Sequence, residues 1–98
     1  MTDKELLERA AKAAGLPECG WMGPTFVYVK DNEFVDWIPL DDDGDAFRLA
    51  ATMEFELSLG QCGAMVYMKR GPNIEELDEV DYMRAARRAI VRAAAQLA

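Results

Sequence analysis

The chain has 98 residues, 51% of them hydrophobic and 30% charged, and its 18 acidic and 11 basic residues give a formal net charge of −7. We expect one globular domain of the cytoplasm, because the sequence contains neither an apolar run of about 18 residues nor a charged and apolar leader. Direct nucleic-acid binding is not expected, since it depends on clusters of lysine and arginine.

The N-terminal segment predicts a helix that begins at Asp3 and ends before Gly15 and Pro17. Thr2 and Glu5 have the spacing of a capping box, which satisfies backbone amides of the first turn. Apolar residues then recur at helical spacing, at Leu6, Leu7, Ala10, Ala13 and Ala14. The next segment, 18–24, contains two glycines and a proline, which favours an irregular loop with Trp21 or Met22 folded back over the core.

Strands are expected from residue 25 onward. Residues 25–30 are rich in β-branched and aromatic side chains, and both faces are apolar, so this strand should be covered on both sides. After a turn at 31–33, residues 34–37 predict a short returning strand that ends before Pro39.

A second helix is expected from about Asp43 to Met53, because apolar residues recur there at helical spacing. Residues 54–59 alternate strictly between polar and apolar, which predicts a half-exposed strand. Residues 60–63 are a hairpin loop in this interpretation, and 64–69 form the partner strand.

The last helix is expected from near Asp81 to about Leu97. Arg84, Arg88 and Arg92 line one side of it, where we expect pairs with glutamates of the preceding acidic run. The element order α-β-(β)-α-β-β-α predicts an α+β fold, in which a small antiparallel sheet of three to four strands packs against helices. The sequence has neither a linker nor a repeat, so residues 1–98 are expected to form a single domain.

Acidic residues concentrate in two runs of the sequence, either to keep a small domain soluble or to recognise a partner with a basic surface. The first run has seven acids and no basic residue among them: Asp31, Glu33, Asp36, Asp41, Asp42, Asp43 and Asp45. The second run, which includes Glu75 and Glu76, precedes the last helix. The candidate partner-binding residues are Glu33, Asp36, Asp41, Asp42, Asp43, Asp45, Glu75 and Glu76.

The aspartates between 41 and 45 permit more than one interpretation. An EF-hand loop that begins at Asp41 would need glycine where Ala46 stands and glutamate where Thr52 stands, so this calcium motif fails. A looser calcium or magnesium site stays an alternative, although we assign no metal ligands. Capping of the second helix by Asp42 or Asp43 is the simplest interpretation, and the acids beyond the cap are left for a cationic partner.

Residues suited to catalysis are scarce in this chain. It has no histidine, so Ser58, its only serine, lacks the usual general base. Cys19 and Cys62 are expected in separate loops as reduced thiols, and their spacing does not tell whether they lie near each other. We therefore expect no enzyme activity and no cofactor, and a metal-dependent enzyme is the last of the alternatives.

Three blocks of the sequence carry a resemblance to a known family. They are residues 5–16 (ELLERAAKAAGL), 37–50 (WIPLDDDGDAFRLA) and 81–95 (DYMRAARRAIVRAAA), and their order is similar to that in the phage ABA-sandwich domain family of small bacteriophage and prophage proteins. The resemblance implies a helix-sheet-helix sandwich of antiparallel strands and a viral origin. It implies no catalytic residues.

Small size, acidic charge and the viral resemblance favour a non-enzymatic phage accessory protein that binds a host protein in the bacterial cytoplasm. In its sharpest form, this hypothesis describes an inhibitor of bacterial defence, similar to an anti-CRISPR protein, whose acids occupy a basic nucleic-acid-binding surface. The alternative is a structural or regulatory homo-oligomer of the phage that self-associates through the hairpin or the last helix, without a host target.

Overall fold

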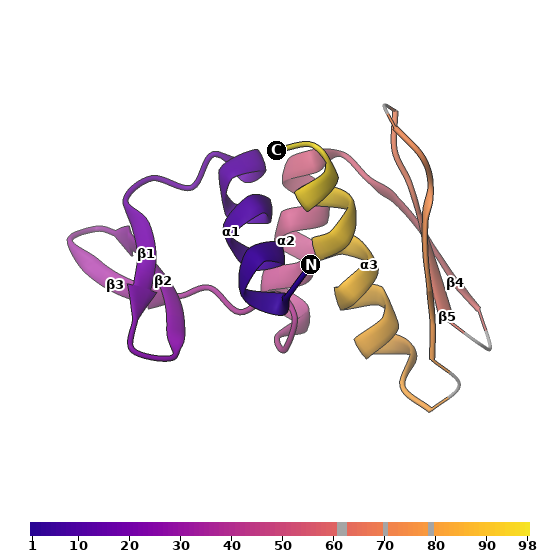
Figure 1. Ribbon diagram of the computed structural model, residues 1–98, viewed down its shortest axis with the longest axis horizontal. Coiled ribbons are helices and arrows are strands. Elements are labelled where there is room, and N and C mark those ends of the chain that lie inside the picture. Colours follow the sequence, from indigo (N-terminus) through magenta and orange to yellow (C-terminus); the bar gives the residue numbers. More distant parts are fainter. Residues whose placement is uncertain (61–62, 70, 79) are drawn as a thin grey trace.

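The computed structural model describes residues 1–60, 63–69, 71–78 and 80–98. Within these ranges, three helices lie in the middle of the molecule, and a three-stranded antiparallel sheet lies at each end (Figure 1). The helices are α1 (Asp3–Ala14), α2 (Asp43–Met53) and α3 (Tyr82–Gln96). The first sheet consists of β1 (Cys19–Met22), β2 (Thr25–Lys30) and β3 (Glu33–Asp36), and the second consists of β4 (Glu56–Gly60), β5 (Gly63–Tyr67) and β6 (Ile74–Leu77).

The expected α+β fold, with antiparallel strands packed against helices, is confirmed. The strands form two sheets in the orders β1-β2-β3 and β4-β5-β6, where one small sheet was expected. The layers also differ from the helix-sheet-helix sandwich that the resemblance implies, because here the helices lie between the sheets (Figure 1). Two strands that the sequence pattern did not predict, β1 and β6, account for the additional pairing.

Strand β1 replaces the irregular loop expected at 18–24, so that prediction is wrong. Its backbone pairs with β2, with Gly20 opposite Val27 and Trp21 opposite Phe26, and the chain turns at Gly23, where φ is 62°. Trp21 does fold back over the core, since its ring lies edge-on against Phe26 with the centroids 5.2 Å apart. Cys19 is the first residue of this strand and is exposed, while Cys62 lies outside the described residues.

The sequence pattern did not predict strand β6, because the strand contains two adjacent glutamates, a residue type that is depleted in strands. The strand still alternates between two faces. Ile74 is buried opposite Val66, and Glu76 points to the same side as Ile74, toward α3. Glu75 and Leu77 are exposed on the other side. Glu76 therefore forms a partly buried ion pair on the inner face of a strand, although its residue type is atypical for a strand.

Two helix starts agree with the expected caps, since Thr2 accepts the amide of Glu5 and Asp42 caps α2. The third helix begins near Asp81, as expected, and Asp81 is its cap. The strand expected at 54–59 begins two residues later than predicted, because Glu54 ends α2 in the left-handed conformation with φ of 58°. Leu59 lies opposite Ala64 on the inner face of the second sheet, as the alternation predicts, and is 50% exposed there.

Helix α3 is the centre of the core. It contacts α1, α2 and all three strands of the second sheet. Its residues with 0% exposure are mostly small: Ala86, Ala89, Ile90, Val91, Ala93 and Ala94. Because alanine brings no bulk, neighbouring elements can approach the helix axis closely. One buried cluster joins this helix to the other two helices and to both sheets, the first of which contributes Phe26.

The pairing of β5 with β6 can be tested at two glycines of the β4–β5 hairpin. A Cβ atom at Gly63 would lie 1.9 Å from the carbonyl oxygen of Glu76, whereas a Cβ at Gly60 would meet nothing within 4 Å. We predict that Gly63→Ala lowers the free energy of unfolding by about 1–3 kcal/mol through overpacking. Gly60→Ala is the matched control and should change it by less than about 0.5 kcal/mol. Equal urea midpoints for the two variants would contradict the register that places Gly63 opposite Leu77.

Candidate functional site

The aspartates between 41 and 45 are used mainly to build the start of α2. Asp42 caps the helix by accepting the amide of Asp45 at 2.8 Å. Asp45 itself is 9% exposed, and its carboxylate accepts the backbone amide of Ile38 at 2.9 Å and Arg48 Nη2 at 2.6 Å. The hydrogen bond to Asp45 is the main reason why the pKa of the Arg48 guanidinium is raised above its ordinary value. The buried Asp45 is therefore not accessible to a partner.

Asp43 and the loop before it are held by α3. Arg87, whose side chain is 15% exposed, donates from Nη1 to Asp43 at 2.7 Å and from Nε to the carbonyl oxygen of Leu40 at 2.9 Å. The expectation that one aspartate of the cluster serves as a cap is confirmed for Asp42. Of the four aspartates, Asp41 is the one for which the described residues provide no ion pair or side-chain hydrogen bond.

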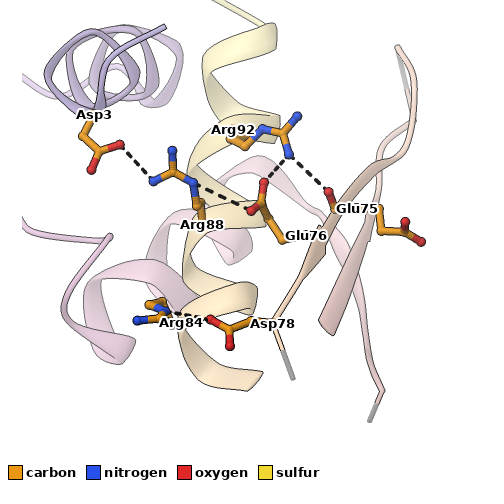
Figure 2. A network of polar contacts seen from close by, with 7 residues as sticks. All are labelled: Asp3, Glu75, Glu76, Asp78, Arg84, Arg88 and Arg92. Atoms are coloured by element: carbon orange, nitrogen blue, oxygen red, sulfur yellow. Dashed lines mark hydrogen bonds and ion pairs between the residues drawn. The ribbon is translucent and has the colours of Figure 1, made fainter. Parts of the chain in front are cut away.

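The arginines of α3 pair with the second acidic run, as the sequence pattern predicts (Figure 2). Arg92 contacts the Glu76 carboxylate and donates to the backbone oxygen of Glu75 at 3.1 Å. Arg88 lies between Glu76, at 3.7 Å, and Asp3 of α1, at 2.9 Å. This network joins α1, α3 and β6. Glu76 is therefore a structural residue, while the Glu75 side chain points away from α3 (Figure 2).

Asp78 organises the entry to α3. Its carboxylate accepts the backbone amides of Val80 and Asp81 at 3.0 and 2.9 Å, and Arg84 Nη2 lies 2.6 Å away (Figure 2). The amide of Asp81, followed by the Arg84 guanidinium and the amide of Val80, lowers the pKa of Asp78 below its ordinary value. The ionised carboxylate is therefore the form that the fold stabilises.

Several acids of the first run are exposed and have no ion-pair partner among the described residues. We call them the hairpin acids, Asp31, Glu33 and Asp36, which follow β2 and lie along β3. Lys30 stands opposite Glu33 in the register, yet no ion pair joins their side chains. Asp41 lies further along the same segment, which runs from the outer end of the first sheet toward α2 (Figure 1). These four carboxylates are the acidic surface that remains for a partner.

The first sheet has an apolar face that the rest of the described chain does not cover. Strand alternation places Phe26 and Tyr28 on the side of the core, where Phe26 lies 5.8 Å from Trp37 between ring centroids. The opposite side, which we call the outer face, carries Met22, Val27, Val29, Phe34 and Asp36. Phe34 is 66% exposed and Met22 is 49% exposed. The outer-face residues of β2 are not exposed, since Val27 is 7% exposed and Val29 is half-buried, and the exposed apolar residues of this face belong to the edge strands β1 and β3.

The sequence pattern indicated the acids of this region as candidate partner-binding residues, but it did not indicate that Phe34 and Met22 are exposed. The signal that could have found them is the apolar alternation of β2 on both faces, which indicates a cover on each side. A single sheet face cannot be judged exposed from sequence, because the element that covers it can come from anywhere in the chain. Only the fold shows that Phe34 and Met22, on the two edge strands, are exposed.

The second sheet also has an exposed side. Met65, Tyr67 and Leu77 point away from α3 by strand alternation, with Glu56 opposite Tyr67 and Glu75 opposite Met65. Tyr67 is 42% and Leu77 is 72% exposed. This is the hairpin face that the homo-oligomer hypothesis concerns, and self-association through it stays a prediction.

The described residues offer little for catalysis or metal binding. No group of three or more histidine, cysteine or carboxylate residues in the described ranges has the geometry of a metal site. A cavity of about 370 Å³ between α1, α3 and β6 has charged walls, but Asp3, Asp78, Arg84 and Arg88 are already paired there with one another or with Glu76. Four of its charged side chains therefore hold the fold, while Asp41, which also lines this cavity, has no ion pair among the described residues.

Comparisons of the chain with family models, with curated proteins and with solved structures find no significant match. The resemblance to the phage ABA-sandwich domain family thus stays a prediction from the three sequence blocks. None of the helices in the described ranges is long and apolar enough to cross a membrane.

The capping role of Asp42 can be separated from the exposed position of Asp41. We predict that Asp42→Ala lowers the free energy of unfolding by about 0.5–2 kcal/mol, because the amide of Asp45 loses its acceptor. Asp41→Ala removes the same charge from the neighbouring residue and should stay within about 0.5 kcal/mol of the unmodified protein. Urea unfolding measures both values. An equal loss in the two variants would refute the distinction.

The lowered pKa of Asp78 predicts a pH dependence of stability. An aspartate with a depressed folded-state pKa stabilises the fold at pH values above its unfolded pKa of about 3.9, and this contribution is lost as the pH falls through the lower folded-state value. We expect Asp78→Asn to lower the melting temperature at pH 7 and to approach the unmodified protein below about pH 4. The control Asp31→Asn removes one exposed charge. A gap between Asp78→Asn and this control that stays constant down to about pH 2 would contradict the assignment.

Proposed function

We propose that this chain is a non-enzymatic accessory protein of a bacteriophage or prophage that binds a basic surface of a bacterial host protein in the cytoplasm. The observation that carries the proposal is the set of exposed carboxylates without an intramolecular partner among the described residues, Asp31, Glu33, Asp36 and Asp41. The arginines of α3, by contrast, form ion pairs with carboxylates of the same chain. The surface that remains available is therefore strongly negative.

A net charge of −7 on 98 residues supports association with a positively charged partner. Complementary charge accelerates encounter and selects partners, and its effect weakens when salt shortens the screening length to about 10 Å or less. A basic channel that normally holds nucleic acid is a target of this kind, because carboxylates on a protein can occupy the positions of phosphates. In its sharpest form, the proposal is an inhibitor of a bacterial defence protein that acts by displacing nucleic acid.

The viral origin in this proposal rests on the three sequence blocks that resemble the phage ABA-sandwich family. The accessory role rests on the chemistry of the exposed residues, and it does not depend on that resemblance. Ser58 and Cys19 are both exposed, and neither has a hydrogen bond to a basic group among the described contacts. We therefore assign them no role in the proposed function.

A charge-neutralised variant tests the proposal. We predict that the tagged protein captures a nucleic-acid-binding protein from a bacterial lysate at low salt and displaces a labelled oligonucleotide from it. Glu33→Gln, Asp36→Asn and Asp41→Asn together should abolish this capture, because they remove three exposed charges of the proposed surface.

The matched control carries Glu18→Gln, Glu56→Gln and Glu75→Gln, three exposed acids elsewhere on the molecule. It loses the same charge and should keep its partner. The proposal would be refuted if both triple variants captured the same protein with the same salt dependence. It would also be refuted if the captured protein retained its oligonucleotide.

A further inference from the structure

The outer face of the first sheet carries exposed apolar side chains. A sheet of this kind buries one face in the core and normally exposes polar side chains on the other. Here the second face carries Met22, Val27, Val29 and Phe34, and Phe34 is 66% exposed. Val27 is 7% exposed although it does not belong to the core cluster. Large apolar side chains grouped on a surface mark an interaction site.

The charges around this face indicate what covers it. Asp36 lies on the outer face itself, opposite Val27, whereas Glu33 stands opposite Lys30 on the side of Phe26 and Tyr28, and Asp31 lies in the turn between β2 and β3. A second copy of the chain would present the same face, which carries Asp36 and no basic side chain, so this carboxylate would have no partner of opposite charge. The occupant that fits is therefore apolar in its centre and basic at its rim.

The molecule contains an example of how such a face is covered. The inner face of the second sheet, with Val66 and Ile74, is covered by α3, a helix with an apolar stripe. Beside this stripe, Arg92 reaches across to the carboxylate of Glu76 on β6 (Figure 2). The outer face of the first sheet offers the same two elements, apolar side chains on two strands and a carboxylate, Asp36, on the edge strand β3.

We infer that the outer face of the first sheet binds a basic amphipathic helix of a partner protein, with Phe34 as the apolar anchor and Asp36 as the ion-pair partner of its lysine or arginine residues. The inference rests on the proposed function, since it specifies the partner chemistry at the same acidic region. It adds an apolar anchor that charge alone does not require. Exposed aromatic residues at the centre of an interface commonly carry much of its affinity.

A designed peptide tests the inference without knowledge of the natural partner. The probe is a synthetic 18-residue helix with leucine along one side and arginine flanking it, and the control peptide has every arginine replaced by glutamate. NMR titration of the whole protein should shift the resonances of Met22, Val27, Val29 and Phe34 with the basic peptide and leave them unchanged with the acidic one.

Two exposed residues on edge strands provide a matched pair of variants. Phe34→Thr should weaken binding of the basic peptide at least about tenfold, because it removes the anchor. Leu77→Thr, at a residue that is 72% exposed on the second sheet, should change the dissociation constant less than about twofold. Both substitutions place a β-branched residue in a strand, and unchanged melting temperatures would confirm that both variants fold.

The outcomes separate this inference from the proposed function. If Phe34→Thr binds the basic peptide like the unmodified protein while the triple variant of Glu33, Asp36 and Asp41 does not, the inference is overturned and the proposed function stands. If Phe34→Thr loses binding of the basic peptide and the triple variant keeps it, the basic partner chemistry is wrong, and both proposals fail. Peptide-induced shifts confined to the second sheet would overturn the inference. So would a concentration-dependent dimer in light scattering that Phe34→Thr abolishes, because the occupant would then be a second copy.

Discussion

The close packing of α1, α2 and the second sheet around α3 is the constraint on which the structure depends. Its alanines at 86, 89, 93 and 94 are fully buried, so α1, α2 and the second sheet can all approach one helix. Alanine loses no side-chain entropy on burial, which favours such a helix in a short chain. The consequence is that the polar side of α3 cannot remain fully hydrated. Arginines 84, 87, 88 and 92 emerge between neighbouring elements, and each meets a carboxylate there.

This use of arginine changes how the acidic composition is understood. Asp43, Glu76 and Asp78 face arginines of α3, and Asp45 binds Arg48 and the amide of Ile38. Much of what looked like acidic surplus in the sequence therefore holds the helices and the second sheet together. Among the acids without an ion pair in the described residues, Asp31, Glu33 and Asp36 lie around β3, far from α3 (Figure 1), whereas Asp41 lines a cavity beside Arg84 and Arg88. Exposed charge and exposed apolar surface occur together on the first sheet, as they also do on the second with Glu75 and Leu77, and we propose the first sheet as the partner site.

The sequence predicted the helices well, because their signals are local. Thr2, Asp42 and Asp81 cap by contacts within three residues, and the helices begin at or near the positions that the sequence predicts. Strands β1 and β6 could not be predicted, since their pairing is non-local and their residues are atypical for strands. For the same reason Asp45 was taken as a surface acid. One of its partners, the amide of Ile38, becomes a neighbour only when the chain folds.

The central claim is that a basic partner covers the outer face of the first sheet. Amide hydrogen exchange of the protein, alone and in complex with the partner captured at low salt, tests this claim most directly. We expect binding to slow exchange in β1, β2 and β3 and to leave β4, β5 and β6 unchanged. Protection confined to the second sheet or to the surface of α3, with the first sheet exchanging as in the free protein, would contradict it.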